Sequence, residues 1–427
     1  MRADQNVVLT RTGPDTPMGN LFRCFWIPAL LSEELPSPDC RPVRVTLLGE
    51  RLVAFRDTEG RIGLLDAHCP HRRAELFWGR NEGSGIRCVY HGWKFDVEGR
   101  CIDMPTESPG NRLQEKMCTK AYPVAERGGV IWAYMGPKDT SANVPDLDFA
   151  RVSSGHRYIS KCMMACNYQQ AVEGSIDTAH LSFLHKTLDP TEAGPDVFGV
   201  GDLLKYSDRD GSPRFFVEST EYGLRIAARR SAEADTYYWR ISQWLMPFHV
   251  LVPTAPGLVC RANLFVPIDD EHCWWYRVRW HRDRPLTSDE VAGYRSDGLD
   301  YAELIVDTYL PRGNRGNDYL IDRAAQRRSS FTGIPSAQLQ DIAIQESQGA
   351  IVDRAKEHLG TSDAAIIECR RALLQAAKDL QQGTAPNATG KPEVYRVSAV
   401  AITLKRDVDP FQLRDDVIGS PAQPVSA

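Results

Sequence analysis

The sequence of 427 residues predicts an α+β fold in which an all-β domain precedes a mixed domain. Between residues 45 and 150, short apolar runs alternate with Gly, Pro or Asp turns, a pattern typical of antiparallel strands. After Arg151, strand-like runs are mixed with helical ones, and apolar spacing predicts a helix from Asp363 to Leu380. We therefore expect one domain over residues 1–150 and a second over residues 151–427.

Individual strands are predicted where β-branched and aromatic residues are concentrated. In the first domain these runs are residues 44–48, 52–55, 62–65, 86–87 and 130–134. In the second domain they are residues 215–218, 237–241 and 273–278. Residues 244–260 are apolar but contain three prolines, so we expect sheet and turn there and no membrane span.

Two short motifs in the first domain carry metal-ligand residues, namely Cys69-Pro-His71 and Cys88-Val-Tyr-His91. Two thiolates on one iron and two imidazoles on the other define a Rieske [2Fe-2S] cluster. The same four residues could instead hold a structural zinc ion. Each motif follows an apolar, strand-like run, and turn residues adjoin the ligands, so two hairpin-like loops could hold one cluster. The flanking sequence therefore favours the cluster over zinc.

A second motif contains His180 and His185, five residues apart. On a straight helix their side chains would point about 140° apart, so binding one metal requires a kink or a distorted turn. Two histidines and one carboxylate form the facial triad of oxygen-activating non-haem Fe(II). The alternative is a pair of helix histidines that pack independently.

Together these segments resemble the bacterial Rieske ring-hydroxylating oxygenases, and most closely the phthalate dioxygenase branch. The resemblance rests on residues 69–74, 88–96 and 167–185 and extends over nearly the whole chain. It implies a catalytic domain with a helix-grip fold, in which a curved antiparallel sheet surrounds helices. It also implies that Asp341, within residues 337–349, is the third iron ligand, with Glu346 as the competing candidate.

The same resemblance assigns a bridging role to Asp177, which would link His180 to His91 of a neighbouring subunit. On a helix Asp177 would share nearly the same face as His180. The alternative is a helix-terminal aspartate that accepts backbone hydrogen bonds. Such a bridge requires a homotrimer or stacked trimers. Asn167 also matches a residue near the iron in this family.

The resemblance further implies O2, a small aromatic substrate and a separate NAD(P)H-dependent flavin and iron-sulfur reductase as partners. An anionic substrate of the phthalate type would need a cationic side chain, and a planar guanidinium can bind a carboxylate in a bidentate way. Arg240 is the first candidate, because alternation places it with Tyr238 and Ser242 on one face of a strand. Arg214 is the second candidate.

Composition limits the possible functions further. The formal net charge is −5 and no basic cluster is interleaved with aromatic residues, so we expect no nucleic-acid partner. Of eleven cysteines, the nine outside the cluster motifs form an odd number, which favours the reducing cytoplasm. No glycine-rich dinucleotide loop is recognisable. Asp353 and Glu357, with Arg354 between them, are typical of a solvated helical face.

We therefore predict an oxygenase that hydroxylates an aromatic compound. Three alternatives remain open. A Rieske monooxygenase or O-demethylase acting on an aryl ether would use the same iron ligands. An electron-transfer Rieske protein or a zinc-bound protein would not need His180, His185 and Asp341.

Overall fold

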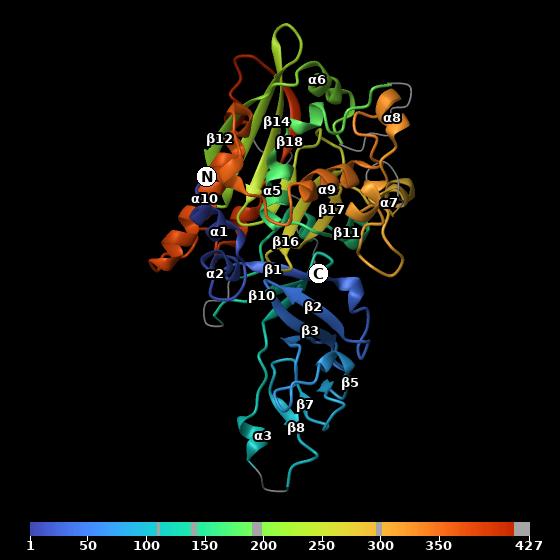
Figure 1. Cartoon of the computed structure of the whole chain (residues 1–427), viewed down its shortest axis with the longest axis vertical. Coiled ribbons are helices and arrows are strands. Elements are labelled where there is room, and N and C mark those ends of the chain that lie inside the picture. Colours follow the sequence, from blue (N-terminus) through green and yellow to red (C-terminus); the bar gives the residue numbers. More distant parts are fainter. Residues whose placement is uncertain (109–111, 138–142, 190–198, 296–300, 414–427) are drawn as a thin grey trace.

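The computed structural model describes residues 1–108, 112–137, 143–189, 199–295 and 301–413. The molecule is elongated, with a narrow lobe of small sheets below a wider lobe that is built around one large sheet (Figure 1). The narrow lobe comes from the first third of the chain, as the blue and cyan colours indicate. The predicted order, an all-β part followed by a mixed part, is confirmed.

The narrow lobe contains two antiparallel sheets, one of three strands in the order β2-β3-β4 and one of four strands in the order β5-β6-β7-β8. Their bounds are β2 Val43–Leu47, β3 Glu50–Arg56, β4 Ile62–Asp66, β5 Arg80–Glu82, β6 Gly85–Arg87, β7 Lys94–Phe95 and β8 Cys101–Asp103. All the strand predictions made for this part of the chain are therefore confirmed.

A third sheet joins the two lobes. Its order is β1-β10-β9, with β1 at Trp26–Leu31, β9 at Val124–Arg127 and β10 at Val130–Tyr134. Every residue of β1 and β10 is buried. β1 contacts both β2 of the narrow lobe and β11 of the wide lobe, so the lobes share a packed junction.

The wide lobe is organised by an eight-stranded antiparallel sheet in the order β11-β17-β16-β15-β14-β13-β12, with β18 paired to β14. The strands are β11 Arg157–Met164, β12 Arg214–Ser219, β13 Gly223–Ser231, β14 Thr236–Leu245, β15 His249–Val252, β16 Cys260–Pro267, β17 Cys273–Trp280 and β18 Val400–Lys405. One half of β14 pairs with β15 and the other half with β18. Residues 244–260 form sheet and turn, as expected.

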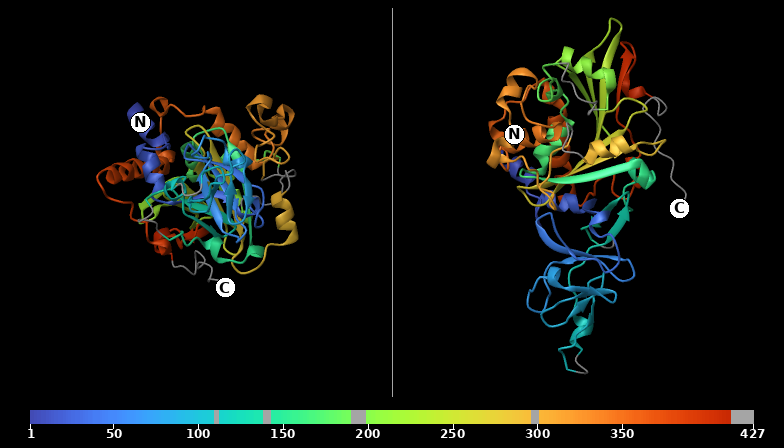
Figure 2. Two further views of the ribbon diagram at one scale, coloured as in Figure 1. Left: turned by 90° about the horizontal axis from the view of Figure 1, so that it is seen from below. Right: turned by 90° about the vertical axis from the view of Figure 1, so that its right-hand side faces the viewer.

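The helices of the wide lobe gather mainly on one face of this sheet (Figure 2). The α-helices outside the narrow lobe are α1 Ala3–Thr10, α2 Pro17–Arg23, α4 Asp148–Arg151, α5 Tyr168–Ile176, α6 Leu204–Arg209, α7 Ser288–Arg295, α8 Arg323–Arg328, α9 Ala337–Ser347 and α10 Ala364–Gln381. The short helix α3, Leu113–Lys116, belongs to the narrow lobe, where it contacts β8 (Figure 1). α5 contacts β15, β16 and α9, and α10 packs on α1 and α2. In the described part of the chain, no helix is long and apolar enough to cross a membrane.

Short 3-10 turns connect these elements. They are Ser32–Glu34, Leu76–Trp78, Ser154–His156, η5 His180–Ser182, Gly201–Leu203, Arg315–Leu320, η9 Arg354–Lys356, Thr361–Asp363, Pro392–Tyr395 and Pro410–Gln412.

The largest hydrophobic core continues from the wide lobe into the junction sheet and includes Leu52 and Leu64 of the narrow lobe. A smaller, separate core in the narrow lobe contains Cys69, Cys88 and Trp93. Because the large core crosses residue 150, packing alone does not define a boundary there, and the division at residue 150 stays a prediction.

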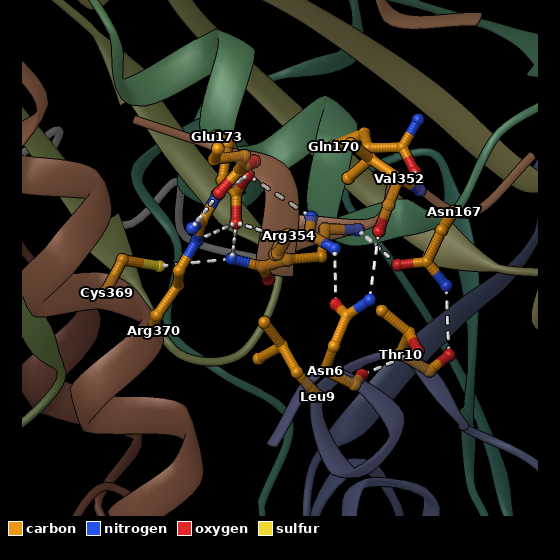
Figure 3. Close-up of polar contacts among 12 residues, drawn as sticks. Asn6, Leu9, Thr10, Asn167, Gln170, Glu173, Val352, Arg354, Cys369 and Arg370 are labelled. Carbon is orange, nitrogen blue, oxygen red and sulfur yellow. Dashed lines mark hydrogen bonds and ion pairs between the residues drawn. The ribbon is translucent and has the colours of Figure 1, made fainter. Parts of the chain in front are cut away.

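A buried polar network fixes α5 against the segments that follow α9 (Figure 3). Both oxygens of Glu173 on α5 accept hydrogen bonds from Arg354 at 3.2 Å and from Arg370 on α10 at 2.7–2.8 Å. Arg354 also donates to Asn6 of α1. Burial alone would raise the pKa of Glu173, but the two guanidinium groups lower it below its usual value.

This network corrects one sequence-based prediction. Asp353 is exposed, as predicted, but Arg354 between the two acidic residues is fully buried in a 3-10 turn and Glu357 is only partly exposed, so the three residues do not form one solvated helical face. Glu357 accepts hydrogen bonds from Arg370 instead. The prediction was wrong because spacing within a short segment does not reveal a partner about 180 residues away in the chain.

The replacement Glu173→Gln should lower the free energy of unfolding by about 3–5 kcal/mol, because it leaves two buried guanidinium groups without their shared counter-charge. Urea unfolding at neutral pH measures this change. The matched control is Glu368→Gln, whose pair with Arg371 lies on the exposed side of α10 and should contribute less than about 1 kcal/mol.

The pH dependence has a defined sign. The folded-state pKa of Glu173 is lowered. Its contribution to the free energy of unfolding is therefore fully present above the unfolded-state pKa of about 4.3 and is lost as the pH falls through the folded-state pKa. The difference in stability between the wild-type protein and Glu173→Gln should therefore shrink in acid. Equal stability of the two proteins at neutral pH would contradict this account of the network.

Candidate functional site

Two loops of the narrow lobe present the first set of ligand residues, one following β4 and the other between β6 and β7. The amide of Cys69 donates a hydrogen bond to the carbonyl of Ala74, and the amide of Cys88 donates to that of Trp93, both at 2.8 Å. The two loops therefore close in the same way, five residues after each cysteine.

Each loop also contains a residue with positive φ four positions after its cysteine, Arg73 at 60° and Gly92 at 75°. A Cβ atom at Gly92 would lie 2.6 Å from the Pro105 side chain, so glycine is needed there for space as well as for conformation. The two loops thus have the same backbone form and can hold one cofactor from two sides.

The four side chains of these loops lie together. Cys69 and Cys88 are each 2% exposed and interact through their thiols, which raises the pKa of Cys69 and lowers that of Cys88 to about 6. The rings of His71 and His91 are 4.4 Å apart between centroids. His71 also stacks on Trp93 at 4.4 Å with an interplanar angle of 7°.

This donor set fits a [2Fe-2S] cluster better than one zinc ion. The buried Nδ1 of His71 has no hydrogen-bond partner among the described residues, as expected for an atom that binds a metal. Ligand atoms of a single zinc lie within about 4.6 Å of one another. In the described chain, the one group of three or more candidate ligands within 4.8 Å belongs to the second motif. The wider spacing in the cluster loops suits two irons.

The second motif begins where helix α5 ends. α5 stops at Ile176, Asp177 has an extended conformation with φ −73° and ψ 119°, and a 3-10 turn follows at His180–Ser182. This is the distortion that the spacing of His180 and His185 required. The two imidazole rings lie 5.1 Å apart, at an angle of 73°.

Asp341 on α9 completes this group. Its Oδ1 lies 3.3 Å from Nε2 of His185 and 3.8 Å from Nε2 of His180. One ligand atom from each residue lies within 4.8 Å of the others, so the three side chains could hold one ion. Two imidazoles and one carboxylate on one side of a metal match the facial triad of non-haem Fe(II).

Glu346, the competing carboxylate, lies elsewhere. It accepts hydrogen bonds from the amide of Ala165 at 2.8 Å and from the hydroxyl of Tyr319 at 2.7 Å. Because Glu346 is five residues after Asp341, it projects from a different face of α9. Its role in the described structure is to join α9 to neighbouring segments.

The imidazole of His185 is oriented by Gln340, whose Oε1 lies 2.7 Å from Nδ1. Gln340 is itself held by a hydrogen bond from its Nε2 to the carbonyl of Ile334. This contact directs Nε2 of His185 toward Asp341, the arrangement that commonly orients metal-binding histidines. No feature of the sequence pointed to Gln340 other than its position beside Asp341.

Asp177 contacts the turn that follows it. Its Oδ1 accepts a hydrogen bond from the amide of Ala179 at 2.7 Å, and its Oδ2 lies 3.4 Å from Nδ1 of His180. Burial alone would lower the pKa of His180, but the contact with Asp177 raises it. The expected helical relation between the two residues is wrong, because the helix ends before Asp177. The expected proximity is nevertheless present.

Asn167 lies at the other end of α5 and caps it. Its Oδ1 accepts a hydrogen bond from the amide of Gln169, and its Nδ2 donates to the carbonyl of Asp270. Nδ2 also donates to the carbonyl of Thr10 (Figure 3). It is fully buried and does not line the cavity beside Asp341. Asn167 thus ties the start of α5 to α1.

A cavity of about 60 Å³ adjoins His180, His185 and Asp341. Its sheet side includes Arg240 and Ser242 of β14, so the predicted alternation places both in the cavity wall. Arg261 of β16 and Arg277 of β17 also line it. These two arginines were not identified from the sequence, although alternation within their strands could have grouped them.

The cavity wall is strongly basic near Arg240, which is 3% exposed. Its Nη1 donates to the hydroxyl of Tyr238 at 3.3 Å, and its Nε is buried without a hydrogen-bond partner among the described residues. Neighbouring Arg230 donates to backbone carbonyls, and burial together with Arg240 lowers its pKa to about 10. An anion bound here would relieve this concentration of positive charge.

Arg214 does not line this cavity. It is an exposed residue of β12, and its guanidinium lies 5.2 Å from the centroid of the Phe216 ring.

Comparisons with known proteins agree with this arrangement. Residues 25–123 match the family model of the Rieske [2Fe-2S] domain, and residues 133–411 match that of the LigXa C-terminal domain-like family. The chain is 39% identical to phthalate 4,5-dioxygenase oxygenase subunit of Pseudomonas putida, covering 95% of this chain and 93% of the relative. It is 38% identical to 3-chlorobenzoate-3,4-dioxygenase oxygenase subunit of Comamonas testosteroni, covering 91% and 92%.

A third relative, 5,5'-dehydrodivanillate O-demethylase oxygenase subunit of a Sphingobium strain, is 31% identical and covers 95% of this chain and 88% of its own length. Among solved structures, dicamba monooxygenase bound to dicamba matches with a TM-score of 0.59 and 18% identity, covering 85% of this chain and 99% of that one. This structural likeness establishes the fold.

These matches extend over both lobes and include relatives that are named oxygenase subunits. The predicted resemblance, enzyme class and cofactors are thereby confirmed. The chain belongs to the Rieske oxygenases, as an oxidoreductase subunit with a Rieske [2Fe-2S] cluster and a mononuclear non-haem iron.

Proposed function

We propose that this chain is the oxygenase component that uses O2, and electrons from a separate NAD(P)H-dependent flavin and iron-sulfur reductase, to hydroxylate an aromatic carboxylate of the phthalate type. The observation that carries this proposal is the position of Arg240, which lines the same cavity as His180, His185 and Asp341. Phthalate and chlorobenzoate, named for two relatives, are both aromatic carboxylates.

The proposed cofactor ligands follow from the two groups of side chains. Cys69, Cys88, His71 and His91 would hold the cluster, and His180, His185 and Asp341 would hold the iron. When bound, the cluster supplies single electrons and the ferrous iron supplies O2 activation. The chain's own groups fix the ligands, with Gln340 orienting His185 and Asp177 orienting His180.

The substrate would lie between the metal ligands and the sheet. A carboxylate can accept two parallel hydrogen bonds from the planar guanidinium of Arg240, whose buried Nε has no protein partner in the described residues. Arg261 and Arg277 add positive charge to the same wall. Binding an aromatic ring requires this cavity of about 60 Å³ to widen, and enclosing the ring there would exclude water and strengthen those contacts.

The alternative reactions remain within the same site. Monohydroxylation or O-demethylation of an aryl ether would use the same iron ligands. The similarity to a dehydrodivanillate O-demethylase subunit supports O-demethylation as the second candidate reaction. A Rieske protein limited to electron transfer would not need the group formed by His180, His185 and Asp341.

We also propose a homotrimer or stacked trimers, in which His91 of one subunit approaches Asp177 of the next. The cluster loops and α9 lie in different lobes of one chain (Figure 1). Val89 and Tyr90 beside His91 are 58% and 54% exposed, and Phe183 and Phe331 near His180 are 54% and 45% exposed. Burying these exposed apolar side chains between copies would favour assembly.

A cytoplasmic location is the remaining part of the proposal. None of the eleven cysteines, all of which lie in described segments, forms a disulfide, including those outside the cluster loops. Free thiols in this number suit a reducing compartment.

Metal analysis tests the assigned ligands. Purified protein should contain about three irons per chain together with labile sulfide and show a Rieske-type paramagnetic signal when reduced. Cys88→Ala should remove the cluster and leave about one iron, whereas Asp341→Ala should leave about two. Glu346→Gln is the matched control on α9 and should retain all the iron. One zinc per chain without sulfide would refute the assignment.

Asp177→Asn tests the bridging role. Both metal centres should be retained, because Asp177 is not a proposed ligand, but single-turnover electron transfer from the reduced cluster should slow at least about 10-fold. Asp353→Asn changes an exposed aspartate and serves as the control. A loss of iron, or an unchanged transfer rate, would remove Asp177 from the electron path.

Arg240→Met tests the substrate class. Loss of a charge-assisted, bidentate contact should raise KM for an aromatic carboxylate about 10- to 100-fold while metal content stays unchanged. Arg214→Met is the matched control outside the cavity and should leave KM near the wild-type value. If Arg240→Met has no effect, or if uncharged aromatic compounds are preferred, the carboxylate proposal fails and the oxygenase assignment still stands.

A further inference from the structure

Gln345 is a polar residue of the cavity wall. It has no role in the proposed iron site or in the proposed carboxylate contact of the arginines. It lies on α9 four residues after Asp341 and therefore on the same side of the helix, one turn further along. It is 6% exposed and lines the cavity. Its side-chain Oε1 is buried and has no hydrogen-bond partner in the described chain. A buried amide in this state is costly unless another molecule pairs with it.

Gly174 makes room for this amide. A Cβ atom at Gly174 would lie 2.2 Å from Nε2 and 3.0 Å from Cδ of Gln345, closer than non-bonded atoms approach. Gly174 is inside helix α5, where glycine is less favourable than alanine by about 1 kcal/mol. The close approach of Gln345 explains why glycine occupies position 174 despite this cost. Both residues line the cavity that contains the proposed iron ligands.

The contacts of Gln345 indicate that its position is fixed by its backbone. The carbonyl of Gln345 accepts a hydrogen bond from Nε2 of Gln170 on α5 at 3.0 Å. Gln170 also donates to the carbonyl of Gly349 at 3.0 Å, which locks the end of α9 against α5. The backbone of Gln345 is thus fixed beside the cavity, while its side-chain Oε1 accepts no hydrogen bond from the described chain.

We infer that the carboxamide of Gln345 binds the substrate directly and recognises an oxygen-bearing substituent of its aromatic ring. The unpaired Oε1 can accept a hydrogen bond from a hydroxyl group of the substrate, and Nε2 can donate to a hydroxyl, an ether oxygen or a second carboxylate. It acts from the helix side of the cavity, whereas Arg240 acts from the sheet side. This inference rests on the proposed function and adds a determinant of substrate choice to it.

The test compares dissociation constants of benzoate and of the three hydroxybenzoates for the anaerobic holoenzyme, measured by calorimetry. The wild-type protein should bind at least one hydroxybenzoate more tightly than benzoate, by about 3- to 10-fold for one neutral hydrogen bond. Gln345→Leu should abolish this difference and leave the affinity for benzoate within about twofold. Gln348→Leu, which changes an exposed glutamine at the end of the same helix, should retain the preference.

Two changes at Gly174 give an independent check. Gly174→Ala should displace the Gln345 amide and remove the preference although Gln345 is still present. The double variant Gly174→Asn with Gln345→Ala returns a carboxamide to the same space from α5 and should restore part of the preference. Rescue of this kind would not follow from a purely structural role of Gln345.

The outcomes separate the two proposals. If benzoate binds and Gln345→Leu keeps the wild-type preference, or if the wild-type protein has no preference for any hydroxybenzoate, the inference about Gln345 is wrong and the proposed function stands. If no aromatic carboxylate binds the wild-type protein, the proposed function and this inference both fail.

Discussion

Helix α5 ends at Ile176, and the chain has to turn there before His180 and His185 can approach the same point. On a continuous helix the two imidazoles would point about 140° apart. Asp177 supports the turn by accepting a hydrogen bond from Ala179 with one oxygen, and its other oxygen contacts His180. One carboxylate therefore shapes the backbone and orients an imidazole at the same time. The proposed iron site depends on this turn, because without it His180 and His185 could not bind the same metal ion.

The turn is useful only because α5 and α9 are held in a fixed relation, since Asp341 lies more than 150 residues further along the chain. Gln170 of α5 donates to two carbonyls at the end of α9, and Glu173 binds Arg354 and Arg370. Buried polar contacts of this kind tolerate little displacement, because a broken one leaves unpaired groups. The same close approach brings Gln345 against Gly174 and leaves its amide at the cavity.

Much of this arrangement could be predicted from the sequence, because its signals are local. The cysteine and histidine spacing, the strand composition and the helix of residues 363–380 depend on neighbouring residues. The contacts made by Gln340, Gln345 and Arg354 could not be predicted, since each depends on a partner from a distant segment. Arg214 and Arg240 are both strand arginines, and only the pairing of the strands separates the exposed one from the cavity-lining one.

Within one chain, the cluster loops and the proposed iron site belong to different lobes (Figure 1), and the proposed assembly passes electrons from the cluster of one subunit to the iron of its neighbour. The most direct test uses complexes that contain two inactive chains, Cys88→Ala without a cluster and Asp341→Ala without the iron, co-expressed with different tags and purified through both. The account predicts that these mixed complexes regain substrate turnover, because the intact cluster of one chain serves the intact iron of its neighbour. Mixed complexes with both remaining metal centres present but no more active than either parent would contradict it.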